Sequence, residues 1–299
     1  MGVRPLSPPE VVVEVKALAC ELPSESGLPL SRFSSSDIAA QAISRGIVAD
    51  ISGATVWRWL SEDAICPWRH RSWIFPRDPQ FEVKAGRVLD LYQGLWSGRP
   101  LTGDEYVISA DEKTSIQARI RIHPTGPAAP GQAMRVEHEY ERGGALAYLA
   151  AWDVRLAKLF GRCEEHSGID PFDRLVRQVM TQEPYCSARR VFWILDNGSS
   201  HRGPACVERL RSAFPHIVPV HLPVHASWLN QVEIYFSIIQ RKVLTPNDFS
   251  DLEAVCDRLM RFQRHYERIA EPFEWRFTRK DLTRLMAKLD REPAPVVAA

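Results

Sequence analysis

The most regular hydrophobic pattern in the chain is an apolar run, Val191–Leu195, that ends in an acid, Asp196. β-Branched and aromatic residues in a short run, followed by Asn-Gly, predict a buried strand and a turn. Val107 and Ile108 lead to Asp111 in the same way. Because ligands of open α/β sheets bind beyond the strand ends, both acids are candidates for a functional site.

A helical pattern follows, from Trp228 to Val243. Its apolar residues recur at positions i, i+4, i+7 and i+11 and share one face, namely Val232, Phe236, Ile239 and Val243. Glu233 lies at the start of this helix. We expect its carboxylate to meet those of Asp111 and Asp196. Three hard oxygen ligands favour Mg²⁺ or Mn²⁺ over zinc.

The first part of the chain predicts three short helices, about 8–22, 37–45 and 53–64, with Ser7, Ser36 and Ser52 before them as caps. A tight turn before the last helix is typical of a helix-turn-helix unit. Its recognition helix would present Thr55, Arg58 and Trp59 to DNA. A small helical bundle without that role is the alternative.

Residues 65–80 read as a linker in which Arg69 and Arg71 lie among aromatic side chains. This mixture suits phosphate contact and stacking, and an ordinary packed linker is the alternative. A helix over about 81–96 follows.

The rest of the chain alternates between strand and helix patterns, after a first region of expected hairpins. Gly143-Gly144 is read there as a hairpin turn. The expected strands are 106–110, 114–122, 136–140, 145–153, 191–195 and 217–221, and the expected helices are 170–181, 204–214, 228–243 and 251–265. This order predicts an α/β fold with a mixed sheet flanked by helices.

Composition argues against several classes of protein. The 299 residues are 45% hydrophobic and carry a net charge of only +1, so bulk charge does not indicate nucleic-acid binding. The six cysteines form no Cys-x-x-Cys or Cys/His cluster, which argues against structural zinc and suits a reducing cytosol. No apolar run is long enough for a membrane span, and no signal peptide precedes the first helix.

Three motifs together carry a family resemblance: ADEKT around Asp111, LDNGSSH around Asp196, and LPVHASWLNQVE ending at Glu233. They resemble the catalytic core of a DDE transposase, in the mariner-like superfamily and its bacterial insertion-sequence relatives. The acids are separated by 85 and 37 positions, which suits this branch. Leu-Pro and Leu-Asn before the last acid, here 222–223 and 229–230, also match.

The resemblance implies a ribonuclease-H-like fold in which Asp111, Asp196 and Glu233 hold two Mg²⁺ or Mn²⁺ ions. It implies double-stranded DNA as partner, both terminal inverted repeats and target DNA, with a homodimer on the DNA, in the cytoplasm and associated with the nucleoid. Relatives begin with another helix-turn-helix and a linker that resembles Gly2–Pro5, so we expect this chain to lack the first such unit. The expected domains are 1–66 (helix-turn-helix), 67–100 (linker and helix), 101–290 (catalytic) and 291–299 (flexible tail).

Further residues near the acids are secondary candidates. His201 and Lys113 could contact phosphate or water, although His201 could also be structural and Lys113 could pair with Glu112. Asn230 could contact the DNA backbone or cap the Glu233 helix. Glu112 is left out of the site because neighbours on a strand point to opposite faces. Asp153 ends another strand and is read as a decoy for a fourth ligand.

The leading interpretation is therefore an insertion-sequence transposase that cleaves DNA at element ends and joins them to target DNA. Two alternatives stay open. One is a non-catalytic DNA-binding remnant, favoured by the expected loss of the first unit and opposed by the intact acids. The other is a stand-alone ribonuclease-H-like nuclease, opposed by the expected helix-turn-helix.

Overall fold

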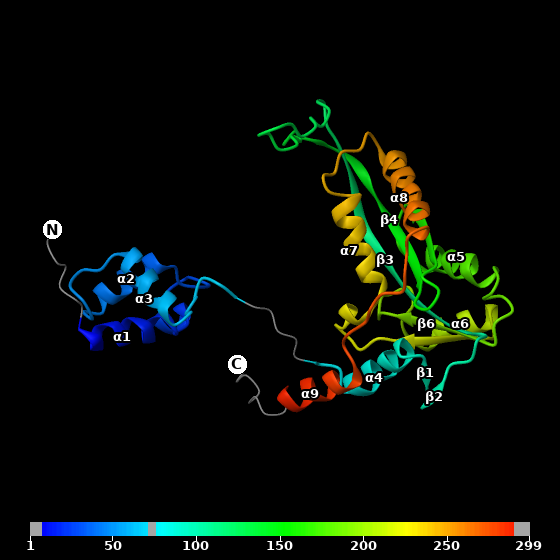
Figure 1. Ribbon diagram of the computed structural model, residues 1–299, viewed down its shortest axis with the longest axis horizontal. Coiled ribbons are helices and arrows are strands. Elements are labelled where there is room, and N and C mark those ends of the chain that lie inside the picture. Colours follow the sequence, from blue (N-terminus) through cyan, green and yellow to red (C-terminus); the bar gives the residue numbers. More distant parts are fainter. Residues whose placement is uncertain (1–7, 71–75, 290–299) are drawn as a thin grey trace. The chain divides into compact units, whose positions relative to one another are not determined.

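The computed structural model describes residues 8–70 and 76–289. The chain forms two compact units, Met1–Ile74 and Phe75–Ala299 (Figure 1). Three sequence predictions fall outside the described residues, namely the Ser7 cap, the contact of Arg71 and the flexible tail 291–299.

The N-terminal unit contains three α-helices and one 3₁₀ turn among its described residues: α1 (Pro9–Ala19), η1 (Pro23–Ser26), α2 (Ser35–Ser44) and α3 (Gly53–Glu62). Apolar residues from all three helices meet in one small core, including Leu18, Ile38 and Leu60. The expected cap at Ser36 is wrong. Ser34 caps α2 instead, because its hydroxyl and the Asp37 carboxylate close a reciprocal capping box.

The second unit is built on a five-stranded sheet with the order β5-β4-β3-β6-β7. The strands are β3 (Glu105–Ile120), β4 (Glu141–Asp153), β5 (Leu159–Glu164), β6 (Arg190–Leu195) and β7 (Ile217–His221). β4 pairs antiparallel with β3 and β5, whereas β3, β6 and β7 run parallel. The predicted mixed sheet is confirmed.

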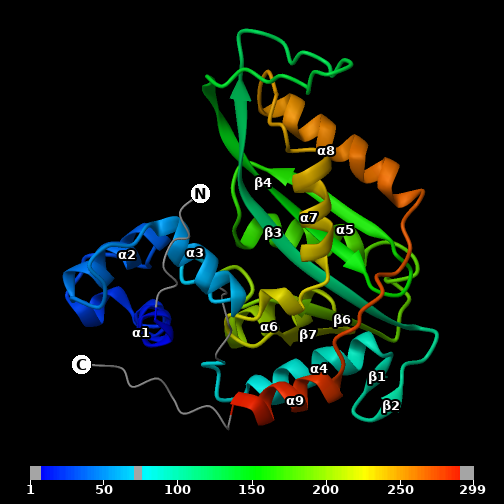
Figure 2. The same cartoon turned by 60° about the vertical axis from the view of Figure 1, so that its left-hand side comes forward.

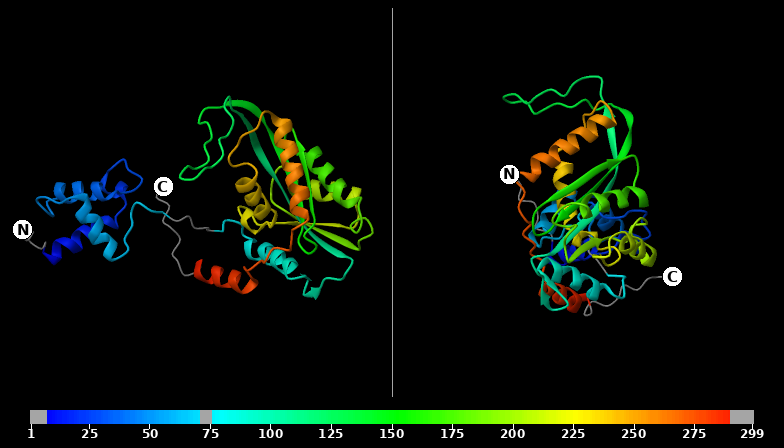
Figure 3. Two further views of the ribbon diagram at one scale, coloured as in Figure 1. Left: turned by 45° about the horizontal axis from the view of Figure 1, so that its top comes forward. Right: turned by 90° about the vertical axis from the view of Figure 1, so that its right-hand side faces the viewer.

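Helices cover both faces of this sheet. The helices are α4 (Phe81–Tyr92), α5 (Ile169–Met180), α6 (Gly203–Ala213), α7 (Val232–Lys242), α8 (Leu252–Glu267) and α9 (Arg279–Leu289), with a 3₁₀ turn η2 at Ser227–Leu229. One core joins a sheet face to α4, α7, α8 and α9, and another joins the opposite face to α5 and α6. Figures 2 and 3 show α7 and α8 on one side of the sheet and α5 on the other.

Two predicted hairpins are wrong. β3 continues without a turn through the expected break, and β4 contains the Gly143-Gly144 pair instead of turning there. A Cβ on Gly143 would lie 2.9 Å from Ile120 Cδ1, so this glycine makes room for a cross-strand neighbour. The expected strand 136–140 belongs to the loop that joins β3 to β4.

Several elements were not predicted or end earlier than expected. β5 and α9 were missed, as was the two-residue pairing of β1 (Leu95–Trp96) with β2 (Arg99–Pro100). α4 stops at Tyr92 instead of continuing to about 96, and the expected 228–243 helix is a 3₁₀ turn followed by α7. Among the described helices, none combines the length and apolarity that crossing a membrane requires.

Candidate active site

Asp111 and Asp196 lie at the point where the parallel strands β3 and β6 separate. The last paired residues are Ser109 and Ile194, and continuing that register by two residues sets Asp111 opposite Asp196. Adjacent strands are about 4.8 Å apart, and both residues have the parity of the face that packs on α7. The two carboxylates therefore share one face at one strand end.

Glu233 reaches this place because the start of α7 is tied to β3. The Val232 backbone N–H donates to Ser109 Oγ over 2.9 Å. The fully buried Asn230 side chain accepts from Ser109 Oγ and donates from Nδ2 to Ala110 O (3.0 Å) and Asp111 Oδ2 (3.1 Å). These bonds hold the first turn of α7, and with it the exposed Glu233, beside the two strand acids.

The electrostatics of the three acids agree with this proximity. Burial, together with the charges of Asp196, Glu112 and Glu233, raises the pKa of Asp111 to about 7. Partial burial also raises the pKa of Glu233, with Lys113 opposing and the Asp196 charge adding to the shift. Such mutual repulsion is what a bound cation would relieve.

His201 connects Asp196 to Glu112. Its ring is fully buried, with Nδ1 3.1 Å from Asp196 Oδ1 and Nε2 3.1 Å from Glu112 Oε2. Burial alone would lower the pKa of His201, but Glu112 and Asp196 outweigh it and raise that pKa. The enclosed ring of His201 contacts these two carboxylates, and its contact with phosphate or water stays a prediction.

The exclusion of Glu112 from the site was wrong. A carboxylate oxygen of Glu112, one of Asp111 and a ring nitrogen of His201 lie within 4.8 Å of one another. Ser200 Oγ also donates to Glu112 Oε1 over 3.3 Å. Two features of the sequence could have indicated that Glu112 belongs to the site: it directly follows Asp111, and a histidine lies five positions after Asp196.

The structure also gives the contacts of the other secondary candidates, Lys113, Asn230 and Asp153. Lys113 lies near Glu233 and forms no ion pair with Glu112 among the described residues. Asn230 does not cap α7 through its side chain, because its amide is used on β3. Asp153 is no ligand, since its buried carboxylate accepts from the N–H groups of Arg155 and Leu156 (each 2.8 Å) and from Tyr185 Oη (2.8 Å).

In the N-terminal unit, Ser52 caps α3 as expected by accepting from Thr55 N. Arg58 is exposed and Thr55 is half-buried. The expected exposure of Trp59 is wrong: Trp59 packs against the helical core, and Trp57, with 55% of its surface exposed, takes the outward position. Arg69 is exposed beyond α3.

A five-stranded sheet in this order, with β3, β6 and β7 parallel and helices on both faces, is a ribonuclease-H-like fold. The solved Mos1 mariner paired end complex with Mn has this fold, with a TM-score of 0.56 and 14% identity over 97% of this chain and 80% of that chain. A pre-cleavage Mos1 transpososome gives a TM-score of 0.55 and 15% identity over 98% and 83%, and a Mos1 strand transfer complex gives 0.54 and 14% over 97% and 80%.

The chain belongs to the DDE superfamily endonuclease family, whose model matches residues 106–256, just over half of its length. It is thus a DDE-type endonuclease. No curated protein matches it. The matched region runs from β3 to α8 and contains all three candidate acids.

Proposed function

We propose that this chain is an insertion-sequence transposase that cleaves DNA at element ends and joins the cut ends to target DNA. What supports the proposal is that the charges of Asp111, Asp196 and Glu233 act on one another, with Asp111 on β3 beside the carboxyl end of β6. The family match and the fold shared with a mariner transposase support it.

The acidic site fits divalent cations of the Mg²⁺ or Mn²⁺ type. It offers hard carboxylate oxygens, and burial first, then the neighbouring charges of Asp196, Glu112 and Glu233, raise the pKa of Asp111. Asp111, Asp196 and Glu233 would hold two such ions. When bound, such ions activate the attacking oxygen and stabilise the leaving oxygen of a phosphodiester.

The surrounding residues of the chain prepare these carboxylates. Asn230 fixes one oxygen of Asp111, and the Gly198 N–H and the His201 ring fix Oδ1 of Asp196 at 2.7 and 3.1 Å. Lys113 supplies a positive charge beside Glu233, where a phosphate would approach. Such outer contacts hold ligands in the orientation that a metal needs.

We further propose that double-stranded DNA is the partner, with both terminal inverted repeats and target DNA as substrates. The Mos1 structures are a paired end complex and a strand transfer complex, which supports a homodimer on DNA for this chain as well. In the N-terminal unit, the exposed Arg58 and Trp57 on α3 suit a DNA-reading helix. The site of action would be the cytoplasm, in association with the nucleoid.

The test is cleavage of duplex DNA that carries the inverted repeats flanking the coding sequence, in Mg²⁺. We expect strand cleavage followed by joining to a second duplex, and loss of both in Asp196→Ala. Asp257→Ala, which removes an exposed ion pair with Arg261 on α8, is the matched control. Activity that survives Asp196→Ala would contradict the proposal, and preferential cleavage of an RNA–DNA hybrid would instead indicate a nuclease.

A further inference from the structure

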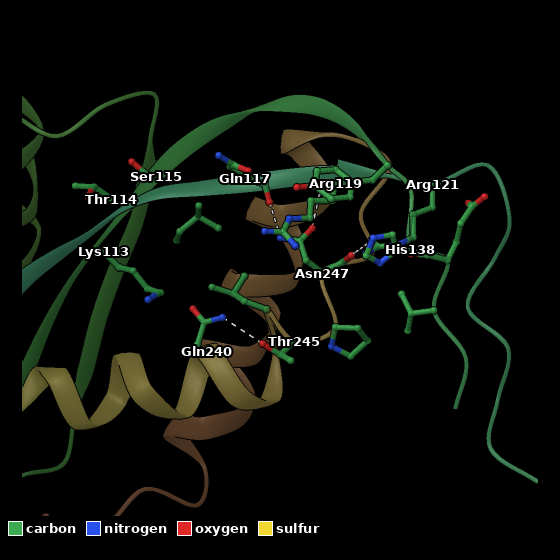
Figure 4. Close-up of a pocket in the computed structure, with 16 residues that line it drawn as sticks. Lys113, Thr114, Ser115, Gln117, Arg119, Arg121, His138, Gln240, Thr245 and Asn247 are labelled. Atoms are coloured by element: carbon green, nitrogen blue, oxygen red, sulfur yellow. Dashed lines mark hydrogen bonds between the residues drawn. The ribbon is translucent and has the colours of Figure 1, made fainter. Parts of the chain in front are cut away.

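A polar groove of about 870 Å³ follows the distal part of β3, between this strand, the end of α7 and the loop that joins β3 to β4 (Figure 4). We call it the β3 groove. The residues that matter for its chemistry are Lys113, Gln117, Arg119, Arg121, Gln240 and Asn247. None of them belongs to the set of acidic ligands.

The β3 groove is positively charged. Lys113, Arg119 and Arg121 line it, and among its described lining residues Glu137 is the one carboxylate. Glu137 is already engaged, because it accepts from the N–H groups of 122 and 123 (3.0 and 2.9 Å) and lies 2.8 Å from the His123 ring. The groove is therefore more basic than a chain of net charge +1 would suggest.

The guanidinium group of Arg119 makes no hydrogen bond among the described residues. Its guanidinium carbon lies 4.6 Å from the centre of the Tyr140 ring, and its Nε is buried without a hydrogen-bond partner. No carboxylate lies within ion-pair distance of it among the described residues. Nε itself is enclosed, so a ligand that brings oxygen acceptors would meet the Nη groups of Arg119, which make no hydrogen bond within residues 8–70 and 76–289.

The neighbouring groups are held in fixed positions. Arg121 donates from Nε to Glu137 O over 2.7 Å and from Nη1 to Asn247 O. Asn247 pairs with β3 through the backbone of Arg119 and Gln117, at 3.0 and 2.6 Å. The wall of the groove is thus organised before any ligand arrives, which lowers the entropic cost of binding.

The Lys113 end of the β3 groove lies near the acidic site. Lys113 is two residues beyond Asp111 on the same face of β3, and its charge acts on Glu233. Figure 4 shows Lys113 at one end of the groove and Arg121 with His138 at the other. Lys113 and Arg121 are eight positions apart, which corresponds to roughly 25 Å of strand.

We propose that the β3 groove binds the sugar-phosphate backbone of one DNA strand as that strand leaves the acidic site. This rests on the proposed function, since it assigns a path to the same substrate. Phosphate oxygens would satisfy Arg119 and Lys113, and the neutral amides of Gln117 and Gln240 would add contacts that do not depend on sequence. Binding here releases counterions and is therefore sensitive to salt.

The experiment measures DNA binding by the full chain without cleavage. A fluorescent duplex with a single-stranded arm of arbitrary sequence is titrated in Ca²⁺, and the dissociation constant is followed from about 50 to about 200 mM KCl. The variants are Arg119→Gln, Arg119→Lys, and Arg177→Gln as a matched control on exposed α5, at the opposite face of the sheet.

Removing one phosphate contact should reduce the slope of log affinity against log salt by about one and weaken binding roughly three- to tenfold. We expect this for Arg119→Gln, with the slope restored in Arg119→Lys and unchanged in Arg177→Gln. An unchanged slope in Arg119→Gln overturns the proposal, as does an equal loss in Arg119→Lys. A changed monomer–dimer equilibrium with an unchanged slope would assign the groove to a second copy of the chain instead.

This outcome is independent of the chemistry. If Arg119→Gln has the expected smaller salt slope than the wild type, but the wild type never cleaves DNA in Mg²⁺, the proposed function is wrong. The proposal that the β3 groove binds DNA is then still supported. If cleavage requires Asp196 but Arg119→Gln binds DNA with the salt slope of the wild type, the proposal for the β3 groove is wrong. The proposed function is then still supported.

Discussion

Asn230 offers the sharpest test of how the acidic site is assembled. It is fully buried, accepts from Ser109 Oγ, and donates to Ala110 O and Asp111 Oδ2. Asn230→Ala removes three hydrogen bonds, each contributing about 1 kcal/mol net. We therefore expect the free energy of unfolding to fall by roughly 2–4 kcal/mol, a large part of the usual 5–15 kcal/mol for a domain.

The assay is urea unfolding at constant pH, followed by near-ultraviolet circular dichroism of the buried aromatic residues. Glu233→Gln is the control, because Glu233 is exposed and its replacement should change the free energy of unfolding by less than about 0.5 kcal/mol while abolishing cleavage. A free energy of unfolding for Asn230→Ala within about 0.5 kcal/mol of the wild type would refute the view that this amide ties α7 to β3.

Two further predictions concern the same site. The pKa of Asp111 is about 7 in the folded chain against 3.8 for an ordinary aspartate, so the folded state holds a proton that the unfolded state has lost between these values. Without metal, stability should therefore fall as the pH rises from about 4 to about 7, and Mn²⁺ affinity should rise by about tenfold per pH unit towards 7. Unfolding curves and Mn²⁺ paramagnetic resonance measure both, and Asp111→Asn should flatten the stability profile; a profile as steep as that of the wild type would contradict this. His201→Ala should weaken Mn²⁺ binding about 10- to 100-fold through the loss of its contact with Asp196, and His201→Gln should weaken it less. Equal Mn²⁺ affinities in the wild type and His201→Ala would rule out that role.

The positions of Asp111 and Asp196 could be inferred from the sequence because the signal is local. An apolar run followed by an acid predicts a strand and its end, which is right for Asp196 after β6. For Asp111 the predicted strand end is wrong, because β3 continues to Ile120; the acid lies beside Asp196 because β6 ends there. The burial of Val232, Phe236 and Ile239 likewise confirms the helical spacing around Glu233. What the sequence did not contain was the tie between Asn230 and Ser109, which joins residues 121 positions apart.

One of the strand errors has a clear physical cause. Gly143-Gly144 was read as a turn, although Gly143 lies inside β4; Gly161, in the unpredicted β5, has a similar role. A Cβ on Gly161 would be 2.2 Å from Tyr148 Oη and 2.5 Å from Gln263 Oε1, so this glycine admits side chains from a neighbouring strand and from α8. Close approach and turn formation both require glycine, and only the tertiary neighbours distinguish them.

The case of Glu112 shows where strand alternation stops being a guide. Alternation correctly sends Glu112 and Asp111 to opposite faces, but faces are separated only while a neighbouring strand continues beside them. β6 ends at Leu195, and the following loop brings His201 within 3.1 Å of both Glu112 Oε2 and Asp196 Oδ1. At the end of a shorter neighbouring strand, residues from both faces can therefore act on one site. Two adjacent acids that lie on a long strand, beyond the end of its shorter neighbour, should both be considered as site residues, although their side chains point to opposite faces.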